Sequence, residues 1–169
     1  MQPATRNRCV LTINSGSSSI KFALYREDSP ATQLLSGKIE RIGLPRAVLT
    51  VHDGGKKSDP RPLAAPNHKA AGDFLIKWLG ERLGSAALVG VGHRVVHGGL
   101  NLIEPQRVTP RVLAELRRIR QYVPKHLPAA IALMEVFHRR YPRLTQVACF
   151  DTAFHHEMPR VAKLLPLPR

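Results

Sequence analysis

Cysteine is scarce in this sequence, which contains only Cys9 and Cys149 among its 169 residues. Both lie in short apolar runs typical of strands, where a buried, reduced thiol is the usual state, so nothing indicates a disulfide framework. Long hydrophobic runs are also missing, because no stretch approaches the roughly 18 consecutive apolar residues of a membrane-spanning helix. We therefore expect a soluble, cytoplasmic protein that has no membrane partner.

Acidic residues are few as well: 12 Asp and Glu stand against 26 Lys and Arg, which gives a formal net charge of +14. Such a charge suggests a nucleic acid, an anionic membrane or a small anionic substrate, and charge alone does not choose among them. The arginines of the second half are dispersed through apolar-periodic segments; they are Arg111, Arg117, Arg118, Arg120, Arg139, Arg140 and Arg143. Since they form no unbroken basic block, solvated helix faces are the better interpretation, and we expect no nucleic-acid partner.

Hydrophobic residues make up 43% of the chain, enough for the core of one ordinary domain. Apolar runs on either side of a polar loop predict an antiparallel hairpin of strands at 9–13 and 20–26. Further strands are predicted at 34–42 and 47–53. The segment 54–67 is rich in Gly, Pro and charge, which indicates a surface excursion.

The second half of the chain alternates helical and strand patterns. Helical spacing begins at Lys69 and stops at Gly84, and two more helices are predicted, one capped by Thr109 and one opened by Pro128. Buried strands are predicted on both sides of these two helices, at 88–99 and 146–151. Strands first, followed by alternating helices and strands, indicate an α/β fold with a mixed sheet flanked by helices.

A loop of small polar residues, Asn14-Ser15-Gly16-Ser17-Ser18-Ser19, separates the first two strands and is followed by Lys21. Its backbone N–H and hydroxyl groups could point inward at a phosphate or a metal-bound phosphate, with Lys21 supplying positive charge. A Ser-rich segment is more often only a turn, so both interpretations stay open. The loop is not of the Walker type, because the helix-opening Gly-Lys-Ser/Thr arrangement is absent.

Strand alternation in the segment 88–99 puts His93 and His97 on one face and Arg94 and Val96 on the other. A guanidinium at the end of a buried strand needs an anion, which a carboxylate substrate or a structural Asp could supply, and Val96 could line a small apolar pocket. The two histidines are more simply interpreted as neutral, hydrogen-bonded residues, because nothing nearby completes a set of metal ligands.

Asp151 follows the last predicted strand, and the carboxyl ends of strands are where α/β sheets bind ligands. Thr152 and His155 come shortly after it, so a carboxylate, a hydroxyl and an imidazole lie close together in the sequence. The simpler alternative for Asp151 is a helix N-cap.

Three segments, NSGSSSIKF, GHRVVHGG and FDTAFHHEMP, together resemble the acetate kinase family in residue pattern, order and spacing. The resemblance extends from Val10 to about Pro166. The resemblance implies the acetate and sugar kinase/heat-shock/actin superfamily, and hence an actin-like, ribonuclease-H-like domain. It implies ATP as co-substrate, magnesium, and acetate or another short carboxylate, with a homodimer for full-length members. Residues 1–169 are expected to form the N-terminal half, with the second, nucleotide-binding half absent.

Matched motif by motif, the resemblance assigns the metal and phosphate side to the first segment. Asn14 looks like the family's magnesium ligand and Lys21 like its nucleotide-phosphate contact. Ser17 and Ser19, in the same loop, are expected to bind the nucleotide as well.

The other two segments supply the carboxylate side: Arg94 looks like the residue that holds the substrate carboxylate, Val96 like a wall of the acyl pocket, and Asp151 like the catalytic aspartate. Because a carboxylate is already ionised at neutral pH, we expect Asp151 to orient metal, water or Arg94 more than to abstract a proton.

The chain also departs from the family pattern. Lys125 falls where a pocket-lining Leu is expected, which leaves propionate or butyrate open as alternatives to acetate; we expect its side chain to point outward, because burying an ammonium is costly. The family's Phe-His-Gly-Thr-Ser-His segment, its second catalytic arginine and its glycine-rich nucleotide loops have no counterpart before Arg169. We therefore expect the chain alone to be inactive, with a non-catalytic remnant or binding module as the alternative to an enzyme.

Overall fold

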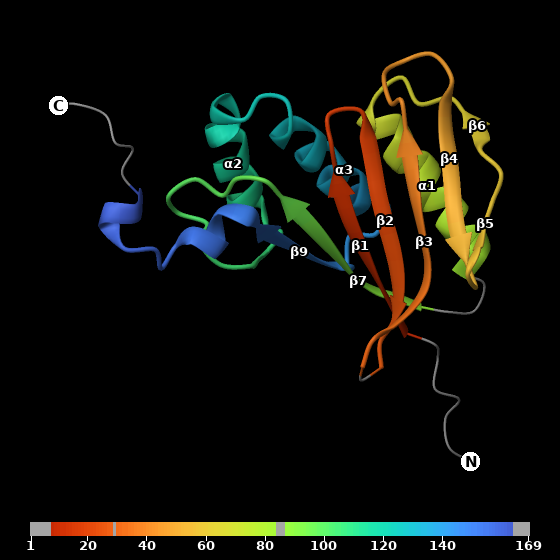
Figure 1. Ribbon diagram of the computed structural model, residues 1–169, viewed down its shortest axis with the longest axis horizontal. Helices are drawn as coiled ribbons and strands as arrows, with labels where there is room; N and C mark the ends of the chain where they lie inside the picture. The colour runs from red at the N-terminus through yellow and green to blue at the C-terminus, as the bar shows by residue number, and fades with distance from the viewer. Residues whose placement is uncertain (1–7, 29, 84–86, 164–169) are drawn as a thin grey trace.

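The computed structural model describes residues 8–28, 30–83 and 87–163. Within these ranges nine strands form one sheet, three α-helices pack beside it, and short 3-10 turns connect or follow them (Figure 1). The strands are β1 (Arg8–Ser15), β2 (Ser19–Arg26), β3 (Thr32–Glu40), β4 (Ala47–Asp53), β5 (Lys56–Lys57), β6 (Arg61–Leu63), β7 (Ala87–Val95), β8 (Gln106–Arg107) and β9 (Thr145–Phe150). The helices are α1 (His68–Leu83), α2 (Pro110–Ile119) and α3 (Leu127–Arg140), with 3-10 turns η1 (Arg120–Tyr122), η2 (Asp151–His155) and η3 (Arg160–Lys163).

The sheet is mixed, with strand order β5-β4-β3-β2-β1-β7-β9-β8 and β6 beside β4. The first four strands form an antiparallel meander, whereas β7 pairs parallel to β1 and β9 pairs parallel to β7. The mixed α/β sheet flanked by helices is therefore the architecture that the sequence predicts. Because β1, β7 and β9 are parallel, their carboxyl ends meet at one edge of the sheet.

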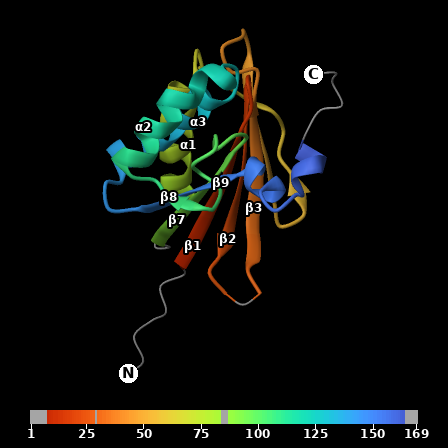
Figure 2. The same ribbon diagram turned by 90° about the vertical axis from the view of Figure 1, so that its left-hand side faces the viewer.

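The α-helices all lie on one face of the sheet, as Figure 2 makes clear. Alternate residues of each strand point at them and are buried, for example Leu11 and Ile13 of β1 and Phe22 of β2. Thr12 and Asn14 alternate with the buried residues of β1 and face the opposite side. The helix-covered face thus holds the core, and the opposite face is free to carry polar groups.

Helix α2 follows the sequence prediction closely. The Thr109 hydroxyl accepts a hydrogen bond from the backbone N–H of Val112, Pro110 opens the helix, and the arginines of its last turn lie on the solvent side. Its buried stripe includes Leu113, Leu116 and Ile119, as predicted. Helix α3 begins one residue earlier than predicted and buries Ile131, Met134 and Phe137.

Some boundaries differ from the prediction. Strand β7 ends at Val95, because the chain turns at Gly98 and at Gly99, whose φ is +68°. A Cβ at Gly98 would collide with the backbone oxygen of Leu102, so the turn requires glycine there. The predicted stop at Gly84 lies outside the described residues. None of the helices in the described part of the chain is long and apolar enough to cross a bilayer.

The prediction that both thiols are buried is wrong for Cys149. Cys9 is buried against the helices, but Cys149 is exposed. The reason is its place in β9, where Ala148 and Phe150 point at the helices and Cys149, between them, points the other way. An apolar strand thus carries an exposed thiol on its uncovered face.

Candidate active site

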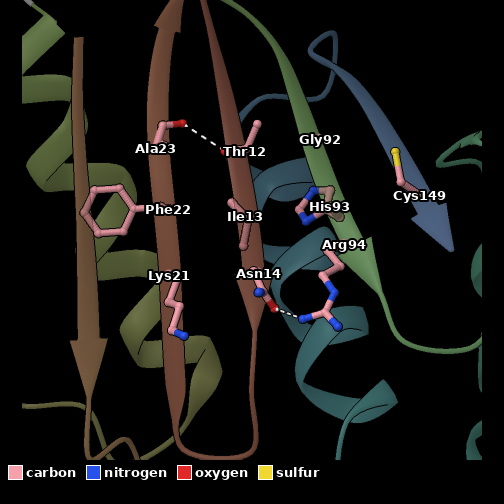
Figure 3. A pocket seen from close by; sticks show the side chains of 10 residues that line it. All are labelled: Thr12, Ile13, Asn14, Lys21, Phe22, Ala23, Gly92, His93, Arg94 and Cys149. Carbon is pink, nitrogen blue, oxygen red and sulfur yellow. Dashed lines mark hydrogen bonds between the residues drawn. The ribbon is translucent and has the colours of Figure 1, made fainter. Parts of the chain in front are cut away.

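Polar side chains form a row across four neighbouring strands on the uncovered face. The pairing register sets Lys21 opposite Asn14, Asn14 opposite Arg94, and Arg94 opposite Cys149. These four residues line a cavity of about 370 Å³ that is open to solvent (Figure 3). The structure therefore brings together three residues that the sequence singles out, and adds Cys149, which the sequence suggests only as a core residue.

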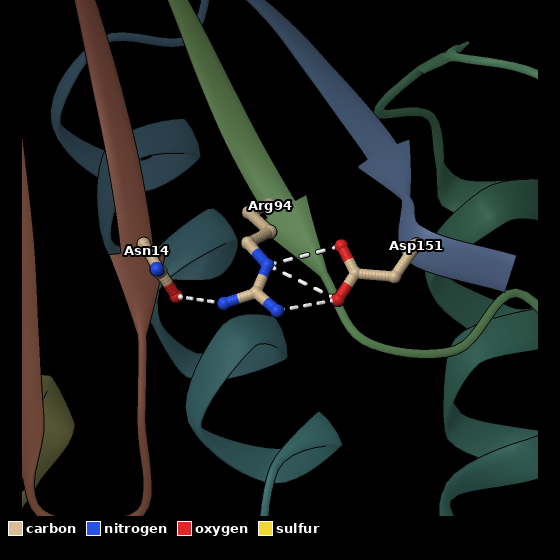
Figure 4. A network of polar contacts seen from close by, with 3 residues as sticks. All are labelled: Asn14, Arg94 and Asp151. Atoms are coloured by element: carbon tan, nitrogen blue, oxygen red, sulfur yellow. Dashed lines mark hydrogen bonds and ion pairs between the residues drawn. The ribbon is translucent and has the colours of Figure 1, made fainter. Parts of the chain in front are cut away.

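Arg94 is the centre of a polar network at the carboxyl ends of β1, β7 and β9 (Figure 4). Its Nε donates to both carboxylate oxygens of Asp151, at 3.0 and 3.1 Å, and its Nη2 donates to Oδ2 at 2.6 Å. Nη1 donates to the side-chain oxygen of Asn14 at 3.2 Å. The hydrogen-bonded carboxylate of Asp151 raises the pKa of the guanidinium above its ordinary value, against a smaller opposing effect of burial.

This network orients Arg94 more than it stabilises the fold. The side chains of Arg94 and Asp151 are 52% and 37% exposed, and ion pairs at such exposure contribute about 0–1 kcal/mol. A guanidinium carries five N–H groups, so Nη1 and Nη2 each keep one more N–H, for which the described residues provide no further acceptor. A planar fork held by two fixed partners is prepared to bind a second anion.

Of the two anions considered for Arg94, the structural one is present, because Asp151 pairs with it. The N-cap interpretation of Asp151 is wrong: Asp151 is the first residue of η2, and Phe150 occupies the cap position. Thr152 accepts a hydrogen bond at 3.0 Å from the backbone N–H of Gly98, which joins η2 to the turn after β7. The side chain of His155 lies outside the part described.

The loop between β1 and β2 is held at both ends by backbone bonds and from the side by a histidine. Gly16 N donates to Ser19 O at 2.8 Å, and Nε2 of His68, the first residue of α1, donates to Gly16 O at 2.8 Å. Burial lowers the pKa of His68, which that hydrogen bond partly offsets. Ser17 is exposed and Ser19 half-buried. His68 carries no local sequence signal, because its partner lies 52 residues away.

The prediction of a neutral, hydrogen-bonded histidine is confirmed for His93. It is 2% exposed, and burial lowers its pKa from near 6.5 to about 4 despite the hydrogen bond to Gln146. His97 is half-buried and accepts a hydrogen bond from the backbone N–H of Gly99 through Nδ1.

Two residues predicted for the acyl pocket lie apart from the cavity beside Arg94. Val96 is half-buried just beyond the end of β7 and is not among the residues lining that cavity. Lys125 is exposed in the turn before α3. The orientation of Lys125 relative to an acyl pocket and the role of Val96 both stay predictions.

Polar groups gathered at the carboxyl ends of parallel strands define an α/β domain with a candidate ligand site at that edge of the sheet. Comparison with known proteins identifies the particular kind: the model of the acetokinase family matches residues 9–169, and the chain belongs to this family.

Among curated proteins, the acetate kinase of Rhodopseudomonas palustris (strain TIE-1) is 40% identical over 164 residues, which cover 95% of this chain and 41% of that protein. The acetate kinase of Deinococcus radiodurans is 42% identical over 159 residues, covering 94% of this chain and 39% of that protein. The chain therefore spans about two fifths of the length of these relatives.

Solved structures agree with this family assignment. The acetate kinase of Porphyromonas gingivalis superposes with a TM-score of 0.86 at 31% identity, covering 96% of this chain and 42% of the other. A propionate kinase from Francisella tularensis gives a TM-score of 0.80 at 30% identity, covering 95% and 41%. These enzymes have an actin-like fold, so the predicted fold family is confirmed.

Proposed function

We propose that the chain supplies the carboxylate-binding side of an acetate kinase, which transfers the γ-phosphoryl group of ATP to acetate and yields acetyl phosphate and ADP. The observation that carries the proposal is Arg94, held between Asn14 and Asp151 at the mouth of an open cavity and keeping two N–H groups for another anion. The family membership and the names of the relatives support the same reaction.

In the proposed mechanism Arg94 holds the acetate carboxylate through its remaining N–H groups. Acetate is ionised at neutral pH, so its oxygen attacks phosphorus without giving up a proton, and no general base is needed. Asp151 then acts by fixing the plane of the Arg94 guanidinium. Alignment of the two substrates and neutralisation of charge would provide most of the rate acceleration.

The phosphate side of the proposed site is built around Lys21 and the loop that contains Ser17 and Ser19. Magnesium is usually held by one or two carboxylates together with substrate phosphates and water. Asp151 provides one carboxylate and Asn14 an amide oxygen, while no group of three or more acidic, His or Cys residues in the described ranges could hold a metal by itself. The residues therefore fit a magnesium ion that arrives with ATP and is completed by its phosphates; the ion would neutralise phosphate charge.

Propionate is the second candidate acceptor, and the likeness to a propionate kinase structure favours it specifically. We expect the aliphatic stem of the exposed Lys125 to cover the acyl pocket while its ammonium stays in water, with Val96 as another wall of that pocket. In a protein completed by the remaining three fifths of its relatives' length, Lys125→Leu should raise propionate use relative to acetate and leave the Michaelis constant for ATP nearly unchanged. Butyrate is a third candidate acceptor, and a purely binding role for the chain is the alternative to an enzyme. A homodimer is proposed for the full-length protein.

The test is titration of the isotope-labelled 169-residue chain with acetate, propionate and butyrate, followed by NMR, beside a turnover assay with ATP and magnesium. Acetate should shift the Arg94 Nε–H signal, and Arg94→Ala should abolish the acetate-dependent shifts in Asn14 and Asp151. Arg94→Lys should lose most of the affinity, because an ammonium lacks the planar fork. Arg111→Ala, at an exposed position of α2, is the control and should bind as the wild type does. Equal acetate shifts in the wild type and in Arg94→Ala would contradict the proposal.

A further inference from the structure

Two polar side chains are buried in the core directly beneath the candidate site. His93 is 2% exposed and precedes Arg94 in β7, and Gln146 is 5% exposed and lies in β9, the strand that leads into Asp151. Both lie on the face of the sheet that the helices cover. Burying such groups is unfavourable unless their hydrogen bonds are made, so their presence calls for a physical reason.

The hydrogen bonds of this pair fix which atom donates and which accepts. Gln146 Nε2 donates to the backbone oxygen of Met134 in α3 at 3.2 Å, which leaves Gln146 Oε1 as the acceptor facing His93 Nε2 at 2.8 Å. Nε2 of the neutral imidazole must therefore carry the hydrogen. The ring of His93 also packs edge-on against Phe137 of α3, with centroids 6.0 Å apart. One chain of contacts thus joins β7, β9 and α3.

The register of β7 against β9 decides whether Arg94 can form its hydrogen bonds with Asp151. Arg94 lies opposite Cys149 and Val95 opposite Phe150, so Asp151 emerges one step beyond the end of β7. A slip of two residues would keep the same face inward but move Asp151 by about 7 Å along the strand, at about 3.3 Å per residue. That movement exceeds what a bidentate contact tolerates. Because a slip of two residues keeps the apolar residues on the buried face, the alternation pattern alone does not oppose it, whereas a buried hydrogen-bonded pair is satisfied in one register only.

We propose that His93 and Gln146 form a positioning pair that fixes β7 against β9 and thereby sets the geometry of Arg94 and Asp151. Neither residue touches a ligand in this proposal; both act through the strands. The geometric part stands on the contacts above, and only its consequence for carboxylate affinity rests on the proposed function.

The decisive variant removes both partners together. In His93→Leu/Gln146→Leu no buried polar group is left unpaired, so the chain should remain folded with a denaturation midpoint close to that of the wild type. The Arg94 Nε–H should nevertheless exchange with solvent at least tenfold faster, and acetate affinity should fall at least fivefold. His93→Gln keeps an N–H donor and should restore both properties to within about twofold.

Two further variants separate positioning from general loosening. Leu49→Val trims a residue buried in β4, away from β7 and β9, and should lower stability without changing Arg94 exchange. Gln146→Asn stays polar but is too short to span both partners, and it tests the idea again if the double variant fails to fold; its Arg94 exchange should also be faster.

Wild-type exchange rates at Arg94 in the folded double variant, or in Gln146→Asn, would overturn the inference. If the wild type binds no acetate while exchange still responds to these variants, the positioning role stands and the proposed function fails. If acetate binds equally well to all variants, the positioning role fails and the proposed function stands.

Discussion

Lowering the pH from about 7 to about 4 should destabilise this chain through His93. Burial holds the pKa of His93 at about 4, whereas a histidine in the unfolded chain titrates near 6.5. Between these two values the unfolded chain binds a proton that the native chain does not, so stability falls as the pH falls. The full contribution is present above pH 6.5. The difference between the two pKa values corresponds to a loss of about 3 kcal/mol, complete near pH 4.

The assay is urea unfolding at a series of pH values, for the wild type and for His93→Gln. Carboxylates also contribute: the side chains of Arg118 and Asn101 lower the pKa of Glu115 to about 2, so that group loses its contribution only at still lower pH. Such effects are common to both proteins and cancel when the two pH profiles are subtracted. The free energy of unfolding of the wild type minus that of His93→Gln should therefore rise by about 3 kcal/mol between pH 4 and 6.5.

His138→Gln provides the matched control, since His138 is exposed on α3 and its removal should leave the pH profile parallel to that of the wild type. The reasoning would be refuted by a His93→Gln profile that is itself parallel to the wild type across this range. In that case His93 would not be the neutral, desolvated residue that its contacts with Gln146 and Phe137 describe.

Three more outcomes can be measured. Thr109→Ala should lower the free energy of unfolding by about 1 kcal/mol through loss of the α2 cap, while Thr109→Ser should be nearly neutral; equal losses would argue against capping. Gly98→Ala should lower the free energy of unfolding by about 1–3 kcal/mol, because a Cβ there collides with the backbone. Gly80→Ala, at an exposed position of α1, should raise it slightly, and the reverse order would contradict the turn geometry. A thiol reagent should label Cys149 in the native chain and Cys9 only after unfolding; mass spectrometry showing equal labelling would refute the assigned faces.

The sequence predicts local structure here far better than it predicts which segments meet. Short apolar runs bounded by polar turns are enough to find β1, β2 and β4, and a cap followed by proline is enough to find α2. The very short strands β5 and β6 are not predicted from the sequence, because two or three residues give no period to detect.

The site itself depends on information that no local pattern contains. Arg94, Asn14 and Asp151 can each be identified as the polar end of a strand, but their contacts follow from the parallel register of three strands far apart in the chain. Cys149 illustrates the same limit: its strand is predicted correctly, yet its exposure depends on which face the helices cover. The bond between His68 and Gly16 is likewise purely tertiary.

The strand order also has a consequence for how the chain folds. β1 and β2 pair through a short turn and can form early, but the Asn14–Arg94 contact closes 80 residues and the Arg94–Asp151 contact closes 57. Contacts of such sequence separation pay a large loop-closure entropy and are made late. The contact between Arg94 and Asp151 therefore requires that β9 has paired with β7. During synthesis, a nascent chain that has emerged only as far as Arg94 contains β1 to β6 and most of β7 but lacks Asp151, so it cannot form the pair between Arg94 and Asp151.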